Sequence, residues 1–282
     1  MNKEKLDLYI ECLDHTVSGE NFKLYRDRDH DMLVTIPKPD ENSLGKYYES
    51  EDYISHTDAK RTIFEKTYHL VKKFSLNRKV KLISKLHKGT GTLLDIGAGT
   101  GDFLIEANKT KWEVVGIEPN QQARVLAKEK GIVLQSDTVN LDSNGFDIIT
   151  MWHVLEHVPD LSAQIKELKR LLKPGGHLVI AVPNFKSYDA QYYKSFWAAY
   201  DVPRHLWHFS KNSIKTLFEE KEMKLKKIMP LVFDAFYVSL LSEKYKNGKM
   251  NFVKALWIGL LSNIKGRRLK EYSSHIYILK NT

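Results

Sequence analysis

The sequence of 282 residues contains a single cysteine, Cys12. One cysteine cannot form an internal disulfide framework or a cysteine-rich zinc module within one chain. Long apolar runs are also absent: residues 252–261 contain Lys254 and fall short of the ~20 residues that a membrane-spanning helix needs. The first fifteen residues mix charged and short apolar stretches and lack the apolar core of a signal peptide. These absences predict a protein of the reducing cytoplasm.

Charge is abundant and unevenly distributed. The chain carries 44 Lys and Arg against 35 Asp and Glu, a formal net charge of +9. Residues 1–59 are acidic, whereas residues 60–88 and 211–282 are strongly basic. Because these blocks alternate along the chain, we interpret them as facing one another or solvent rather than forming one nucleic-acid surface. At 42% hydrophobic residues the chain can bury an ordinary globular core.

The N-terminal part differs in pattern from the remainder. Residues 1–56 predict a polar, irregular extension in which Leu24 and residues 33–36 belong to short strands. Residues 57–88 repeat apolar side chains at helical spacing and predict two basic helices, separated near residues 75–77.

From residue 89 onward, short apolar strands alternate with amphipathic helices. The predicted strands are 92–96, 112–117, 132–134, 146–152 and 177–182, and the predicted helices are 102–109, 121–130 and 161–172. Two late strands, 223–231 and 271–280, flank a largely helical segment. This order predicts an α/β fold with a mostly parallel sheet covered by helices on both faces.

The turn after the first of these strands carries the strongest functional signal. Residues 95–102 read D-I-G-A-G-T-G-D, so the glycines let the backbone turn tightly and approach a ligand. Asp95 would repel a pyrophosphate but suits an ammonium group. Glu118 lies 21 residues after Gly97, at the end of the second strand, where such folds place the acid that binds ribose hydroxyls. A ligand with a ribose, an amino-acid end and no phosphate fits S-adenosylmethionine and not NAD.

Five segments in order resemble the class I S-adenosylmethionine-dependent methyltransferases: 93–104, 114–120, 135–137, 146–160 and 171–184. The resemblance implies a Rossmann-like sheet of seven strands in the order 3-2-1-4-5-7-6, with the seventh strand antiparallel. It implies that S-adenosylmethionine, and the product S-adenosylhomocysteine, are held by Asp95, Gly97, Ala98, Gly99, Gly101, Asp102, Glu118, Pro119, Asp137, Trp152 and His153. In this family the glycines line the methionine and ribose, and Glu118 would hold the ribose hydroxyls. Asp137 would lie at the adenine, and Trp152 and His153 beside the sulfonium.

A further stretch, residues 196–210, resembles a subgroup with the pattern W-x-x-F/Y-D-x-P-R-H-L-x-H-F-S after the fifth strand. Members of this subgroup methylate small molecules, including sugars and quinone precursors, and many carry cysteine pairs of a zinc-ribbon type near the N-terminus. Only Cys12 stands in that region here, so the resemblance implies a degenerate, metal-free hairpin within residues 1–56. The methyltransferase domain would then occupy residues 89–282, with a helical lid at 231–270.

Methyl transfer to a hydroxyl or amine usually needs a base, and histidine titrates in the useful range. The candidates for this role are His157, His205 and His208. We favour His205, because Pro203 and Arg204 beside it indicate a fixed turn with an anion-binding side chain. The candidates for substrate contact are Trp197, Tyr200 and Arg204. The alternative is that this segment only covers the sheet edge.

Residues 153–157 match H-x-x-E-H, a pattern known from zinc peptidases. That chemistry needs a long helix, whereas this segment follows a strand and meets Pro159 after barely one turn. We therefore expect no tightly bound zinc and no metal site. Some quinone-precursor O-methyltransferases bind a divalent cation at an acid–histidine pair in this position, which is an alternative to Glu156 and His157 simply packing the loop.

The sequence thus predicts a small-molecule methyltransferase of the cytoplasm, acting by O-methylation. One alternative is methylation of a lipid-linked sugar or quinone precursor at a membrane surface, contacted through the amphipathic, basic residues 231–270. Another is a nucleic-acid methyltransferase or binding protein, disfavoured because no N/D-P-P-aromatic motif follows the fourth strand. A relative that binds the cofactor without methylating remains a third. The oligomeric state and the methyl acceptor itself are not predicted.

Overall fold

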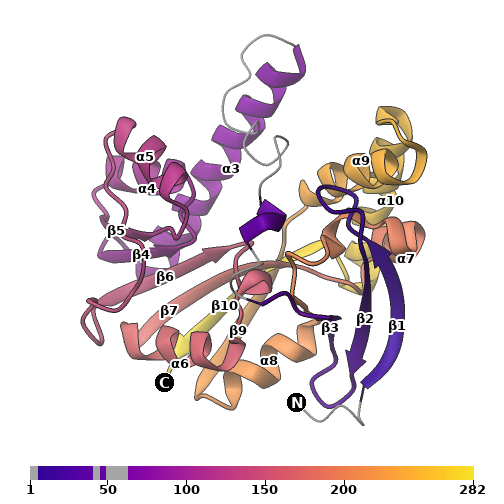
Figure 1. Ribbon diagram of the computed structural model, residues 1–282. Helices are drawn as coiled ribbons and strands as arrows, with labels where there is room; N and C mark the ends of the chain where they lie inside the picture. Colours follow the sequence, from indigo (N-terminus) through magenta and orange to yellow (C-terminus); the bar gives the residue numbers. More distant parts are fainter. Residues whose placement is uncertain (1–5, 41–44, 49–62) are drawn as a thin grey trace.

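The computed structural model describes residues 6–40, 45–48 and 63–282, and its centre is a six-stranded sheet (Figure 1). In spatial order its strands are β5 (Glu113–Ile117), β4 (Thr92–Ile96), β6 (Phe146–Trp152), β7 (Leu172–Pro183), β10 (Ser274–Asn281) and β9 (Met223–Pro230). The first four run parallel, and β10 is antiparallel to both of its neighbours. The predicted α/β class and the antiparallel last strand are therefore confirmed.

Helices cover both faces of this sheet. Successive side chains of β4 point to opposite faces, so Leu93 and Leu94 belong to different apolar layers. Leu93 packs beneath α3 (Ile63–His87), α4 (Asp102–Lys109) and α5 (Gln121–Glu129). Leu94 packs on the side of α6 (Leu161–Leu171) and α8 (Lys211–Glu219). Figure 1 shows these two helix groups on opposite sides of the strands.

Polar side chains on the residue just before a helix decide where several of these helices begin. Asn120 accepts the Ala123 N–H at α5, and Asp160 accepts the Ala163 N–H at α6. Ser210 forms a reciprocal capping pair with Ser213 at α8. Each cap satisfies a backbone donor that the first turn leaves without a partner.

A second, antiparallel sheet contains β1 (Leu6–Leu13), β2 (Asn21–Asp27), β3 (Met32–Ile36) and β8 (Trp207–His208). Its apolar side packs on the segment after β7, which holds α7 (Tyr188–Tyr193) and the short 3-10 turns η4 (Lys194–Phe196) and η5 (Ala198–Tyr200). One further 3-10 turn, η2, spans Gly45–Tyr48. The predicted strands at Leu24 and 33–36 are confirmed, and the hairpin is extended by β1 and by β8.

Three expectations about the elements were wrong. The two helices expected before residue 88 are one continuous helix, α3, because Ser75 and Asn77 are tolerated in a helix that no Gly or Pro interrupts. The strand expected at 132–134 is reduced to an isolated bridge between Ile117 and Gln135, so the described sheet has six strands and not seven. The strand β1 was not expected. Residues 57–62, expected to begin the first helix, lie outside the described residues.

The helical segment predicted between the last two strands contains α9 (Asp234–Asn247) and α10 (Phe252–Leu269). These two helices pack side by side, next to α7, and Figure 1 places them on the side of the molecule away from α4 and α5. Among the described residues, no helix combines the length and apolar character needed to cross a membrane.

Candidate functional site

The glycine loop leaves β4 at the edge where the parallel strands have their carboxyl ends, the usual ligand position of such sheets. Gly97 N and Ala98 N donate to the carbonyl oxygen of Ile117, at 2.8 and 2.9 Å. Gly99 N donates to Glu118 Oε2 at 2.8 Å, and the other oxygen of Glu118 accepts Asn120 N at 2.9 Å. The loop after β4 and the loop after β5 are therefore joined through one carboxylate.

The three loop glycines have different surroundings. A Cβ atom on Gly97 would come within 2.4 Å of Val154, and one on Gly101 within 2.5 Å of Ile132. Gly99 has φ +55°, and a Cβ there would meet no described atom within 4 Å. Gly97 and Gly101 are thus required by close packing, whereas Gly99 borders open space beside Glu118. This is the position at which a bound ligand would approach the backbone.

A buried carboxylate and an ammonium group lie next to this loop. Burial raises the pKa of Asp95 to about 7, against the opposing effects of a 2.5 Å hydrogen bond from Thr150 Oγ1 and the positive charge of Lys79. Lys79 Nζ lies 4.2 Å from the centre of the Trp152 ring, and burial lowers its pKa. A carboxyl group and an ammonium group beside one loop are the two partners that the ammonium and carboxylate ends of an amino acid need.

Trp152 ends β6 and faces the same space. Its indole N–H is buried without a hydrogen-bond partner among the described groups, and the edge of Phe103 contacts its ring at 5.6 Å between centroids. A buried donor without a partner costs free energy, so it marks a position where a ligand or water would be bound.

His153 follows Trp152 with the uncommon φ of 57°. Its ring contacts two carboxylates instead of forming the two-histidine metal site of a zinc peptidase. Its Nε2 lies 3.0 Å from Asp234 Oδ2 in α9, and its Nδ1 lies 3.3 Å from Glu156 Oε1. Burial lowers the pKa of His153, but Asp234 and Glu156 outweigh that effect and raise it to about 10. His153 is therefore a cation that connects the loop after β6 to α9.

The remaining residues predicted to bind the cofactor lie farther out. Asp102 pairs with Lys72 at 2.7 Å and Lys130 at 3.0 Å, which ties α4 to α3. Asp137 is exposed and accepts hydrogen bonds from Ser136 and from the Val139 N–H. Pro119 follows Glu118 on the exposed rim of the same loop. The loop glycines, Glu118 and Trp152 thus lie closer to the centre of the candidate cofactor site than Asp102 and Asp137 do.

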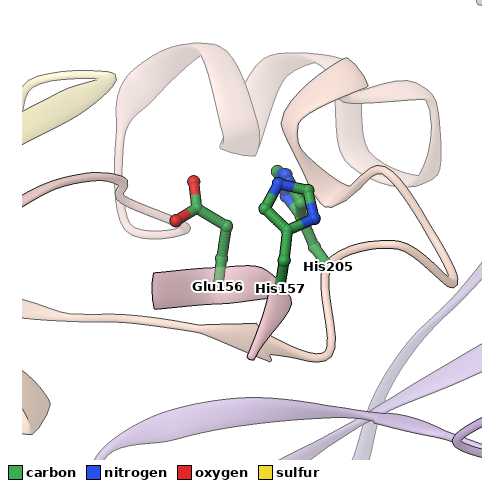
Figure 2. Close-up of side chains that lie close together, drawn as sticks. All are labelled: Glu156, His157 and His205. Atoms are coloured by element: carbon green, nitrogen blue, oxygen red, sulfur yellow. The ribbon is translucent and has the colours of Figure 1, made fainter. Parts of the chain in front are cut away.

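Glu156, His157 and His205 come together on the other side of the loop after β6, as Figure 2 shows. One ligand-capable atom from each lies within 4.8 Å of the others. His157 Nδ1 lies 3.0 Å from the Arg204 carbonyl oxygen, and His205 Nδ1 lies 2.9 Å from that of Ala199. Since a carbonyl oxygen only accepts, both Nδ1 atoms carry the hydrogen, and in the neutral rings both Nε2 atoms carry a lone pair.

The charges in this cluster suit chemistry on a proton or a cation. Burial raises the pKa of Glu156, but the adjacent His153 outweighs it, so the carboxyl group stays ionised. Burial lowers the pKa of His157 to about 4, which keeps this imidazole neutral. An ionised carboxylate beside imidazoles whose Nδ1–H groups bind carbonyls is the kind of arrangement that holds a divalent cation. The same arrangement can accept a proton from an acceptor hydroxyl.

The other members of the segment after β7 are engaged in packing. His208 is buried and lies 3.2 Å from Thr35 Oγ1, which itself donates to the His205 carbonyl. Burial places the pKa of His208 well below its ordinary value. His208 is therefore a neutral group that packs β8 against β3, and it does not belong to the Glu156–His157–His205 cluster.

The guanidinium of Arg204 is occupied by contacts within the protein. Its guanidinium binds Asp201, Asp14 and the Tyr47 carbonyl, and it is 4% exposed. The predicted substrate residues Trp197 and Tyr200 are also buried, and Trp197 donates to Asp189 at 2.7 Å. The geometry gives these three side chains a place between the N-terminal hairpin and the core, so contact with substrate stays a prediction.

Two site residues were missed by sequence reasoning. Lys79 belongs to a basic run interpreted as exposed, and nothing in its local pattern distinguishes it from Lys72 or Lys81. Asp234 begins the helical segment predicted as a lid, and its contact with His153 bridges 81 positions. The one available signal was that Asp234 is one of only two acids, with Glu243, among the many cations of residues 231–270.

Residues 68–225 match a family model described as a methyltransferase domain. A demethylmenaquinone methyltransferase from Staphylococcus aureus is 34% identical over 126 residues, covering 39% of this chain and 52% of that protein. The chain therefore spans about half the length of this curated relative.

Two solved structures share the fold. Geranyl diphosphate C-methyltransferase from Streptomyces coelicolor, in complex with Mg²⁺, geranyl diphosphate and S-adenosyl-L-homocysteine, has a TM-score of 0.54 at 13% identity, covering 80% of this chain and 88% of that one. The cyclase SpnF has a TM-score of 0.51 at 16% identity, covering 72% of this chain and 80% of that one. At such identities the likeness concerns the fold alone.

Proposed function

Because this chain belongs to the family of methyltransferase domains, we propose that it transfers a methyl group from S-adenosylmethionine to a small-molecule acceptor. The observation that carries the proposal is the open position at Gly99, joined by a backbone N–H to the Glu118 carboxylate. The cofactor supplies the activated methyl group, and the protein supplies position, exclusion of water and proton removal.

The cofactor would lie across the carboxyl ends of β4, β5 and β6. Glu118 would accept hydrogen bonds from the ribose hydroxyls, in place of part of its present hydrogen bonding to the glycine loop. The amino-acid end would lie between Asp95 and Lys79, with its ammonium toward the carboxylate and its carboxylate toward Lys79. The Trp152 N–H provides a further donor at the same edge.

The acceptor would bind where the loops after β6 and β7 meet. Leu206 N donates to the Glu156 carbonyl at 2.8 Å, so these loops hold His205 beside His157. A neutral imidazole there can take the proton of an acceptor hydroxyl as the methyl group is transferred, which corresponds to O-methylation. The partial match to a demethylmenaquinone methyltransferase supports a quinone-type or similar small acceptor.

The cluster also supports a second role at the same place. Glu156, His157 and His205 offer one carboxylate and two imidazole ligands, a donor set that fits a divalent cation. Such a cation would lower the pKa of a coordinated acceptor hydroxyl. Dialysis against a chelator, followed by turnover measurements with and without added Mg²⁺, Mn²⁺ or Zn²⁺, distinguishes this role from histidine base catalysis, which a chelator leaves intact.

Calorimetric titration tests the cofactor assignment. We expect heat of binding with S-adenosylhomocysteine and none with NAD. Glu118→Ala should weaken the interaction by about 1.5–3 kcal/mol, the range of hydrogen bonds to charged groups. Glu113→Ala, which removes an exposed carboxylate from the opposite end of the same strand, is the matched control and should leave the affinity unchanged. Binding of NAD without binding of S-adenosylhomocysteine would refute the proposal.

A further inference from the structure

The helix α10 presents its large apolar side chains to solvent. Val253, Leu256, Trp257, Leu260 and Ile264 are between 43% and 81% exposed. Their spacing of three and four residues places them on one face of the helix, here called the α10 apolar face. A contiguous apolar surface of this kind on a soluble fold marks an interaction site.

The opposite face of α10 explains why this orientation is fixed. The residues that pack inward are Ala255, Ile258, Gly259, Ser262 and Gly266. A Cβ atom on Gly259 would come within 2.6 Å of the Phe236 side chain and 3.0 Å of its backbone in α9. The close contact between α9 and α10 therefore needs the small residues inside and leaves the bulky ones outside. The exposed face is a consequence of packing and not of a frayed helix.

Neighbouring elements extend the apolar surface. Phe233 just before α9, Tyr237 of α9 and Met250 before α10 are each about 40% exposed. Phe233 also contacts Phe74 of α3 edge to face, at 6.1 Å between ring centroids. Within the described part of the chain, the α10 apolar face itself is left open to solvent.

The charge along α10 and its immediate flanks has one sign. Residues 244–270 contain eight Lys and Arg residues and no Asp or Glu. Lys249, Arg267, Arg268 and Lys270 are exposed at the two ends of α10. Cations at the border of an apolar, aromatic surface match an anionic lipid bilayer, where each basic side chain adds to binding and the apolar face enters the headgroup region.

We propose that the α10 apolar face docks this protein on anionic membranes. A second copy of the chain is disfavoured as the occupant, because a symmetric contact would bring the same uncompensated cations against one another. Docking itself does not depend on the proposed methyl transfer. One consequence does rest on it: α9, which packs on α10, also carries Asp234 at the candidate site, so a docked protein would hold that site near a membrane-dissolved acceptor.

Co-flotation with lipid vesicles tests the docking. The full chain is mixed with two kinds of vesicle. One contains phosphatidylcholine alone, and the other contains phosphatidylcholine with about 30% of the anionic lipid phosphatidylglycerol. We expect flotation only with the anionic vesicles and its loss at high salt. The triple variant L256S/W257S/L260S should lower the partition coefficient at least about tenfold, and R267Q/R268Q should lower it by a similar factor.

The matched control is V125S/V133S, which removes two exposed valines on and after α5, on the other side of the molecule. It should float like the unmodified chain. Circular dichroism and thermal melting verify that all variants fold, and sedimentation equilibrium measures association. Failure to bind anionic vesicles, undiminished binding of the triple variant, or a dimer that only the triple variant dissolves would each overturn the proposal. Binding to S-adenosylhomocysteine, measured on the same samples, tests the proposed function separately.

Discussion

At the scale of single residues, the glycine loop shows how far sequence reasoning reaches. The pattern of residues 95–102 predicted a ligand loop, and Glu118 was found from its spacing alone. The sequence could not distinguish Gly99 from Gly97 and Gly101, because the space around each depends on Val154 and Ile132 from other elements. Lys79 was missed for the same reason: its burial comes from the helix packing on β6 and not from its neighbours in sequence.

Replacing Gly99 by valine should abolish binding of S-adenosylhomocysteine. The side chain would occupy the open space beside Glu118, and valine strongly disfavours φ +55°. Gly248→Val is the control, since Gly248 has φ +72° and open surroundings but follows the C-terminal end of α9, outside the loop and its packing partners. Both variants should lose similar stability by thermal melting, and calorimetry should detect binding only for the second. Equal affinities would remove Gly99 from the ligand site.

The affinity for S-adenosylhomocysteine should depend on pH through Asp95. Burial raises the pKa of its carboxyl group to about 7, so at lower pH the free protein holds it protonated. An ammonium ligand favours the ionised form, and binding then has to release that proton. The affinity should therefore fall with decreasing pH, by up to about tenfold per unit below pH 7, and level off above it. Asp95→Asn should bind more weakly at pH 7.5 and lack this slope; a variant with an unchanged slope contradicts the assignment.

Alanine substitution should separate the three candidate histidines. His157→Ala and His205→Ala should retain affinity for S-adenosylhomocysteine and lose ~10²–10⁴-fold in turnover with a cognate acceptor. His208→Ala should instead lower the melting temperature, because His208 is buried against Thr35. Full turnover in both of the first two variants would exclude proton removal or cation binding by the cluster.

At the scale of elements, the periodicity of side chains predicted most of the sheet and its helices. Strands β4, β6 and β7 and helices α4 and α6 were found because their apolar positions recur with the period of the element. The failures among the strands lie at sheet edges. The strand expected at 132–134 has a short apolar run but only one bridge to β5, and Val133 is 77% exposed. Local sequence does not report whether an edge segment finds a pairing partner.

The continuity of α3 gives a direct test at this scale. Ser75→Pro should cost about 3 kcal/mol in the free energy of unfolding, because proline removes a hydrogen bond and clashes inside a helix. Ser75→Ala, which keeps the backbone hydrogen bond and has high helix propensity, is the comparison and should cost less than about 0.5 kcal/mol. Denaturant unfolding measures both. A cost near zero for Ser75→Pro would restore the two-helix interpretation.

At the scale of the whole molecule, long-range polar contacts join parts that the sequence could only delimit. Arg204 connects the segment after β7 to Asp14 in the turn after β1, and its carbonyl also orients His157. The hairpin expected from the degenerate zinc-ribbon pattern is thus held by a buried ion pair and an apolar layer. Sequence predicted the hairpin, but two partners of Arg204, Tyr47 and Asp14, lie more than 150 residues away and carry no local signal.

Arg204→Met should therefore destabilise the protein by about 3–5 kcal/mol, since it leaves the buried Asp14 and the half-buried Asp201 without their cation. Arg26→Met, which breaks the more exposed pair with Asp31 in the same hairpin, should cost less than about 1 kcal/mol. Denaturant titration of both variants provides the comparison. Similar small losses would show that the hairpin docks through its apolar layer alone.

The central claim is that the edge formed by β4, β5 and β6 holds S-adenosylmethionine through Gly99 and Glu118. A crystal structure of the protein grown with S-adenosylhomocysteine tests it most directly. We predict that the ribose hydroxyls lie within hydrogen-bond distance of the Glu118 carboxylate, about 3 Å, and that the amino-acid end lies between Asp95 and Lys79. A ligand bound elsewhere, with Glu118 still bonded only to Gly99 N and Asn120 N, would contradict the account.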